Sequence, residues 1–65
     1  MLSNSVMAML INQKVQLTVN LFGRTNILVG ILEKYSKPFL KVKTKQGTRI
    51  LNEFVVREIV PLVGD

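Results

Sequence analysis

The chain has 65 residues and a net charge of +5, and it contains no cysteine and no histidine. These values allow one small domain and exclude disulfides, thiolate or imidazole metal sites, and nucleophilic catalysis that depends on histidine. Hydrophobic residues make up 48% of the chain, which is much for so small an interior, so we expect burial between subunits.

The N-terminal segment favours a short helix. Ser3 is a suitable N-cap. Apolar residues then recur at a spacing that places them on one helical face, namely Val6, Met7, Leu10 and Ile11. We predict a helix over about residues 4–12, and we expect it to dock on the rest of the molecule because an isolated helix this short is marginal in water.

The next stretch favours two strands, the second sharply bent. Residues 15–21 alternate between apolar and polar side chains, which is typical of a strand with one buried face. Residues 22–26 interrupt this alternation and predict a turn. The following run, residues 27–32, is apolar on both sides of Gly30, and a glycine inside such a run indicates a bend or bulge.

Three more strands are predicted after a connection at residues 36–38. Leu40 and Val42 alternate with lysines in the third strand, and Gly47 is expected to supply a positive φ in the following turn. The fourth strand covers residues 49–52, a single 3₁₀ turn is expected at residues 52–54, and the fifth strand ends near Pro61. The sequence thus predicts a mainly β domain spanning residues 1–65. An N-terminal helix precedes a strongly bent five-stranded antiparallel SH3-like barrel at about residues 14–62.

Catalytic patterns are not found. The acidic residues are scattered, without a paired arrangement for acid–base chemistry, and there is no phosphate-binding glycine loop. We therefore expect no enzyme, no cofactor and no metal. No apolar run approaches the ~20 residues of a membrane span, and the first residues lack a basic leader. We expect no membrane segment and a cytoplasmic location, which the absence of cysteine also fits.

Basic residues gather around the predicted turns. Lys41, Lys43 and Lys45 alternate, so they project from one face of a strand and its turn, where they can track phosphates or protect a sheet edge from aggregation. Tyr35 and Phe54 lie at strand ends where a base could stack, with core packing as the alternative for Tyr35. Phe22 and Phe39 are expected to pack in the core or in turns. The residues predicted from this pattern to contact RNA are Arg24, Tyr35, Lys37, Lys41, Lys43, Lys45, Arg49 and Phe54.

The helix, the five-strand pattern and Gly30 together resemble the Sm-like family over roughly residues 4–62. The segment Val19-Asn20-Leu21-Phe22-Gly23, followed by residues 30–35, resembles the first Sm motif, and residues 55–61 are similar to the second. The resemblance implies a closed homo-oligomeric ring of about five to seven subunits, in which the fourth strand of one subunit pairs with the fifth strand of the next.

The resemblance also implies positions that contact RNA. Ser36, Pro38 and Leu40 stand where the family usually has an aspartate, a base-stacking residue and a base-reading asparagine. Asn52 and Phe54 remain as candidates for base contact. We therefore expect an Sm-like ring that binds single-stranded RNA largely through basic surface residues. The alternative is a structural or assembly ring that binds protein partners and has no specific RNA pocket.

Overall fold

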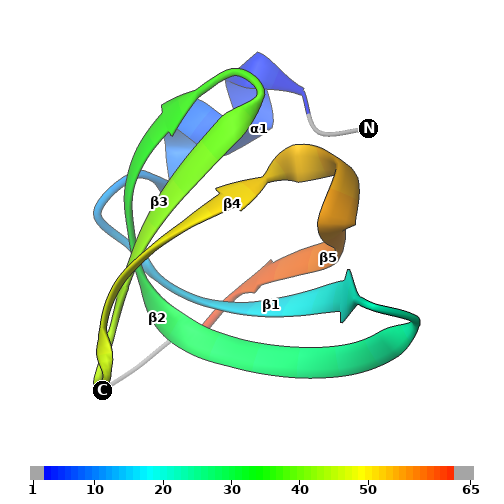
Figure 1. The fold of residues 1–65 in the computed structure, drawn as a ribbon. Helices are drawn as coiled ribbons and strands as arrows, with labels where there is room; N and C mark the ends of the chain where they lie inside the picture. Colours follow the sequence, from blue (N-terminus) through cyan, green and yellow to red (C-terminus); the bar gives the residue numbers. More distant parts are fainter. Residues whose placement is uncertain (1–2, 63–65) are drawn as a thin grey trace.

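The computed structural model describes residues 3–62 as one short helix followed by five strands (Figure 1). In chain order, the elements are α1 (Asn4–Leu10), β1 (Lys14–Leu21), β2 (Arg24–Ser36), β3 (Phe39–Thr44), β4 (Gly47–Asn52), the 3₁₀ turn η1 (Glu53–Val55) and β5 (Val56–Pro61). The prediction of a mainly β domain with an N-terminal helix and five antiparallel strands is confirmed.

The strands form one open sheet in the order β4-β3-β2-β1-β5. β4 and β5 are its edges and do not pair with each other, so the sheet does not close on itself. β2 pairs with β1 along residues 24–31 and with β3 along residues 31–36. This one long strand therefore belongs to both halves of the sheet, and Figure 1 shows it curving from one half into the other.

β2 changes partner next to Gly30, the residue at which the sequence predicted a bend. A Cβ atom at Gly30 would lie 2.4 Å from the carbonyl oxygen of Lys43 in β3. Only glycine allows the backbone of β3 to approach β2 so closely. An irregularity in the β2–β3 pairing between Leu32 and Lys34 adds to the curvature.

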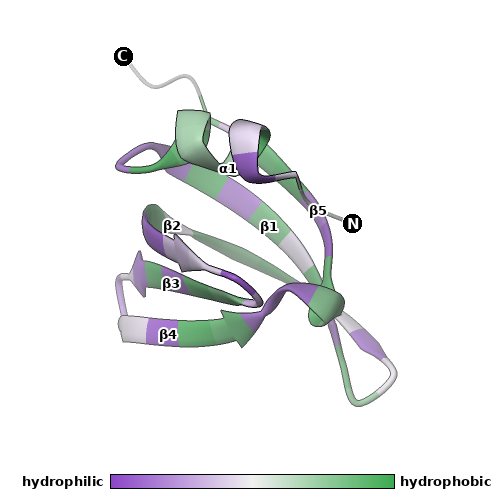
Figure 2. Cartoon of the chain, turned by 90° about the horizontal axis from the view of Figure 1, so that it is seen from above, coloured by the Kyte–Doolittle hydropathy of each residue, from purple (hydrophilic) through white to green (hydrophobic). Residues whose placement is uncertain are grey.

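The concave side of the curled sheet holds the core. In β1, Val15, Leu17 and Val19 are fully buried, and the polar residues between them face outward, an alternation visible in Figure 2. The other strands contribute buried residues to the same cluster: Leu32, Leu40, Val42, Leu51 and Val56. The period-two pattern of the sequence therefore marks the buried face correctly.

The helix is capped as predicted but is shorter than expected. The Ser3 hydroxyl accepts a hydrogen bond from the backbone N–H of Val6 at 3.2 Å. Met7 and Leu10 are buried in the core, whereas Val6 is half exposed, so its predicted place on the buried face is wrong. The helix ends at Leu10 because the backbone of Ile11 is extended, with a ψ of 134°. Asn12 then adopts a positive φ of 67°, and its N–H donates to the Leu32 carbonyl at 2.7 Å.

The first predicted turn is too long. Only Phe22 and Gly23 form it, and residues 24–26 begin β2. Both turn residues have positive φ, 52° and 75°, which is the geometry of the tight type I′ turn between two hairpin strands. The other turns agree better with the sequence: Gly47 has the expected positive φ of 123°, and η1 follows Asn52 as a single 3₁₀ turn.

Candidate nucleic-acid interface

Two segments far apart in the sequence meet at one end of the sheet. The backbone N–H of Glu53, in η1, donates to the carbonyl of Pro38, in the β2–β3 turn, at 2.7 Å. Phe39 and Asn52 are register partners in the β3–β4 pairing beside this contact. The fold therefore brings four of the predicted RNA-contacting residues to one end of the molecule: Tyr35, Lys37, Asn52 and Phe54.

Tyr35 and Glu53 are joined within this end. The Tyr35 ring packs against the core, and its hydroxyl donates a hydrogen bond to Oε1 of Glu53. This hydrogen bond raises the pKa of Tyr35 above its ordinary value, and desolvation and the nearby carboxylate act in the same direction. Because both its ring and its hydroxyl are already engaged, Tyr35 has little left to offer a base, in agreement with the core-packing alternative.

Glu53 is a residue that sequence reasoning did not single out. It is only 4% exposed, and its Oε2 atom has no hydrogen-bond partner among the described residues. A buried carboxyl group is uncommon unless it is paired. No local sequence signal could have identified it, since its partner Tyr35 lies 18 positions earlier in the chain.

Asn52 and Phe54 behave differently from each other. The Asn52 side-chain oxygen accepts a hydrogen bond from the Phe54 backbone N–H at 2.9 Å, which caps η1. The Phe54 ring is 74% exposed. Phe54 is therefore free to stack on a base, whereas Asn52 has only its side-chain N–H groups left for one.

Basic residues also line the outer, convex face of β3. Lys41 and Lys43 are exposed and alternate with the buried Leu40 and Val42. Lys34 of β2 is the direct register partner of Lys41. Lys45, also predicted to contact RNA, lies in the β3–β4 turn rather than on the strand.

Two hydrophobic side chains are exposed beside these lysines. Phe39 is half exposed on the outer face, so its predicted core or turn packing is wrong, because the register of β3 places it on the same side as Lys41. Ile50 of β4 is the register partner of Lys41 and is also exposed. Together with Lys34 and Lys41, these residues border a shallow groove of about 240 Å³.

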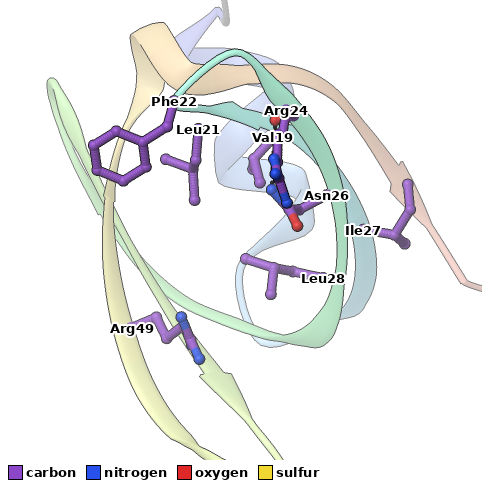
Figure 3. Close-up of a pocket in the computed structure, with 8 residues that line it drawn as sticks. All are labelled: Val19, Leu21, Phe22, Arg24, Asn26, Ile27, Leu28 and Arg49. Carbon is purple, nitrogen blue, oxygen red and sulfur yellow. Dashed lines mark hydrogen bonds between the residues drawn. The ribbon is translucent and has the colours of Figure 1, made fainter.

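Arg24 and Arg49 lie on the concave side instead, at an open mouth of the curled sheet (Figure 3). Arg24 is paired with Leu21, and Arg49 is paired with the buried Val42. The mouth has a volume of about 500 Å³ and is also lined by Phe22 and Asn26, which sequence reasoning did not propose as binding residues. The predicted basic residues that lie in strands thus divide between two faces of the sheet.

Within residues 3–62 no group of three or more acidic side chains could hold a metal ion. Over the same range, no helix has the length and apolar character needed to cross a membrane. Comparisons of the chain with protein-family models, with characterised proteins and with solved structures found no match.

Proposed function

We propose that this protein is an Sm-like protein that forms a homo-oligomeric ring and binds single-stranded RNA, mainly through charge. The fold assignment is supported by the N-terminal helix, by the strand order β4-β3-β2-β1-β5 and by the bend at Gly30. On this proposal the curled sheet corresponds to an SH3-like barrel of the Sm type. RNA contacts come from the basic outer face of β3 and from the end of the sheet that carries Lys37 and Phe54.

One observation carries the RNA proposal: Lys34 and Lys41 face each other directly across the β2–β3 pairing. Like charges at directly opposed positions destabilise a sheet. Lys43 extends the same row along β3. A phosphate bound between these ammonium groups would offset their repulsion, and the exposed Phe39 beside them offers a surface on which a base can stack.

The ring proposal rests on the two free sheet edges. β4 and β5 each have one side without a strand partner in the described chain. Unpaired edges tend to recruit another strand. Pairing of β4 with β5 of a second copy would cover both edges and, if the rotation between copies closes, would give a ring. Sedimentation velocity at micromolar concentration is expected to show an oligomer, and a monomer under these conditions would exclude the ring.

The RNA proposal is tested by titrating labelled oligo(U), oligo(A) and a mixed sequence at two salt concentrations. We expect binding to all three, with little sequence preference and a strong loss of affinity as salt increases. The double variant Lys41→Glu/Lys43→Glu should lower the slope of log K against log salt by about 1.4, since each phosphate contact on a single strand contributes about 0.7.

A matched control keeps the total charge change equal. The double variant Lys14→Glu/Arg57→Glu alters two exposed basic residues in β1 and β5, outside the proposed row. Because Arg57 lies in β5, one of the proposed ring edges, sedimentation velocity must show that this control assembles like the wild type. It should then weaken binding less than the β3 variant does. If wild-type protein binds no RNA at low salt, the proposal is wrong. If both double variants weaken binding equally, the effect is one of net charge and the row on β3 has no special role.

A protein-binding ring is the second candidate, and one surface favours it. Hydrophobic residues remain exposed on the convex face where β5, β1 and β2 lie side by side: Ile27, Val29, Ile31 and Val60. Val29 and Ile31 line a groove of about 510 Å³ bordered by three lysines, Lys14, Lys43 and Lys45. Such a groove fits a protein segment with apolar and acidic residues. Copurified protein that resists nuclease treatment would favour this candidate over RNA.

A further inference from the structure

Phe22 occupies an unfavourable position for an aromatic residue. Its relative exposure is 102%, so the ring is fully in solvent. Its φ of 52° is in the left-handed region, which non-glycine residues seldom adopt. A type I′ turn favours Asn-Gly, which provides the same backbone without a bulky ring. The sequence therefore keeps Phe22 where both its exposure and its backbone act against stability, which is typical of a residue retained for binding.

The surroundings of Phe22 identify the kind of ligand. The open mouth next to it is lined by two guanidinium groups, Arg24 and Arg49, and no acidic residue lines it. In Figure 3, Arg24 extends from β2 and Arg49 from β4 toward the space between them. Guanidinium groups bind phosphate oxygens in a bidentate manner and also stack on planar rings.

The remaining walls of the mouth suit a nucleobase. Leu21 and Leu28 form an apolar floor. The Asn26 side-chain N–H bonds the Arg24 carbonyl at 3.4 Å, so its carbonyl oxygen is left to accept a hydrogen bond from a base or a ribose hydroxyl. The volume of about 500 Å³ is in the range of small-ligand sites.

We propose that this mouth is a base-binding site for RNA, with a base stacked on Phe22 and its adjoining phosphate held by Arg24 and Arg49. The inference rests on the proposed RNA-binding function and adds a site at the β1–β2 turn, on the other side of the sheet from the lysine row. Aromatic stacking, together with basic side chains that contact the phosphates, is the usual means of holding an unpaired nucleotide.

The first experiment uses Phe22→Asn. This variant restores the preferred Asn-Gly turn, so it should fold at least as stably as the wild type, and its melting temperature should not fall. Its affinity for a labelled oligo(U) should drop by about tenfold, since one stacked base contributes about 1–3 kcal/mol. The salt dependence should stay unchanged, because no phosphate contact is removed. An abasic strand of the same length should bind both proteins equally.

A second variant reports on the site directly. The chain contains no tryptophan, so Phe22→Trp introduces a single indole that retains the stacking surface. We expect oligo(U) to quench its fluorescence in a saturable manner, with an affinity within about threefold of the wild type. Arg49→Gln, in contrast, should weaken oligo(U) and the abasic strand alike, because it acts on the phosphate.

The possible outcomes distinguish an error in the proposed base-binding site from an error in the proposed RNA-binding function. If wild-type protein binds no RNA, both proposals are wrong. If wild-type protein binds RNA and Phe22→Asn binds it equally well, the RNA function stands and the site at the mouth is wrong. If Phe22→Asn changes the sedimentation coefficient of the free protein, Phe22 is a contact between subunits and the site is again wrong.

Discussion

The substitution Gly30→Ala tests the feature that shapes the sheet. The added Cβ would lie 2.4 Å from the Lys43 carbonyl oxygen, about 1 Å closer than ordinary van der Waals contact, and 3.0 Å from Cγ1 of Val42. The closest atom belongs to the backbone of β3, which cannot change its rotamer to relieve the clash as a flexible side chain could. β3 must therefore move away from β2, or the bend must open.

We expect this substitution to lower the free energy of unfolding by about 3 kcal/mol, the upper part of the range for overpacked sites. Domains are stabilised by only about 0.05–0.15 kcal/mol per residue, so the loss would be a large share of the total. The melting temperature should fall by about 15 °C. Urea unfolding and thermal unfolding should be measured at one fixed protein concentration, because association also contributes to apparent stability.

Val29→Ala is a suitable control, since it shortens an exposed side chain next to Gly30 in the same strand. It should cost less than about 1 kcal/mol, as most surface substitutions do. Larger residues at position 30 should lower the free energy of unfolding further, so Gly30→Val should be less stable than Gly30→Ala. A Gly30→Ala protein within about 0.5 kcal/mol of the wild type would show that the close approach of β3 does not depend on glycine.

Further predictions concern the two pairs of polar groups described above. Tyr35→Phe should lower the free energy of unfolding by about 2 kcal/mol in urea titrations, because it leaves the Glu53 carboxyl group buried without its hydrogen bond. In wild-type protein the raised pKa of Tyr35 means that above pH ~10 the unfolded chain loses this proton while the folded chain keeps it. Stability should therefore decline as the pH rises from about 10 through the folded-state pKa, and the Phe variant should lack this part of the decline. Lys34→Thr should raise the free energy of unfolding by about 0.5 kcal/mol at low salt, because it removes the repulsion with Lys41. The same variant should weaken RNA binding. Lys14→Thr is its control: the register partner of Lys14 is Ile31, so this variant should not raise stability.

Local patterns were sufficient to predict the elements of this fold. The alternation in β1, the Ser3 cap and the glycine in β2 each act through neighbouring residues, so each could be recognised in the sequence. The turn at Phe22 was predicted too long because its first residue is not one of those preferred for a tight hairpin turn. Where a residue serves a purpose other than folding, it departs from the local preferences of the turn it occupies, and sequence patterns then fail to identify that turn.

The candidate site was less predictable, since it depends on contacts between distant segments. Tyr35 and Glu53 meet only because the β2–β3 turn folds against η1. Arg49 reaches the concave side because the register of β4 pairs it with Val42, and one residue of slip would move it to the opposite face. Sequence spacing could place basic residues on a strand, but it could not state on which face of the curled sheet each would lie.

The division of basic residues between two faces has a consequence for how RNA can bind. Lys41 and Lys43 lie on the convex face of β3, whereas Arg49, on the adjacent edge strand, faces the concave mouth. A single RNA strand could contact both only by passing over the edge of β4. If β4 pairs with a neighbouring subunit in the proposed ring, that path is closed.

The two faces should then bind separate strands, so titration of the assembled protein should show two classes of site. Lys41→Glu/Lys43→Glu should weaken the more salt-dependent class and lower its salt dependence, and Phe22→Asn should weaken only the other class. A single class weakened by both changes would mean that RNA does cross the β4 edge, and the edge would then be free of a neighbouring strand when RNA is bound.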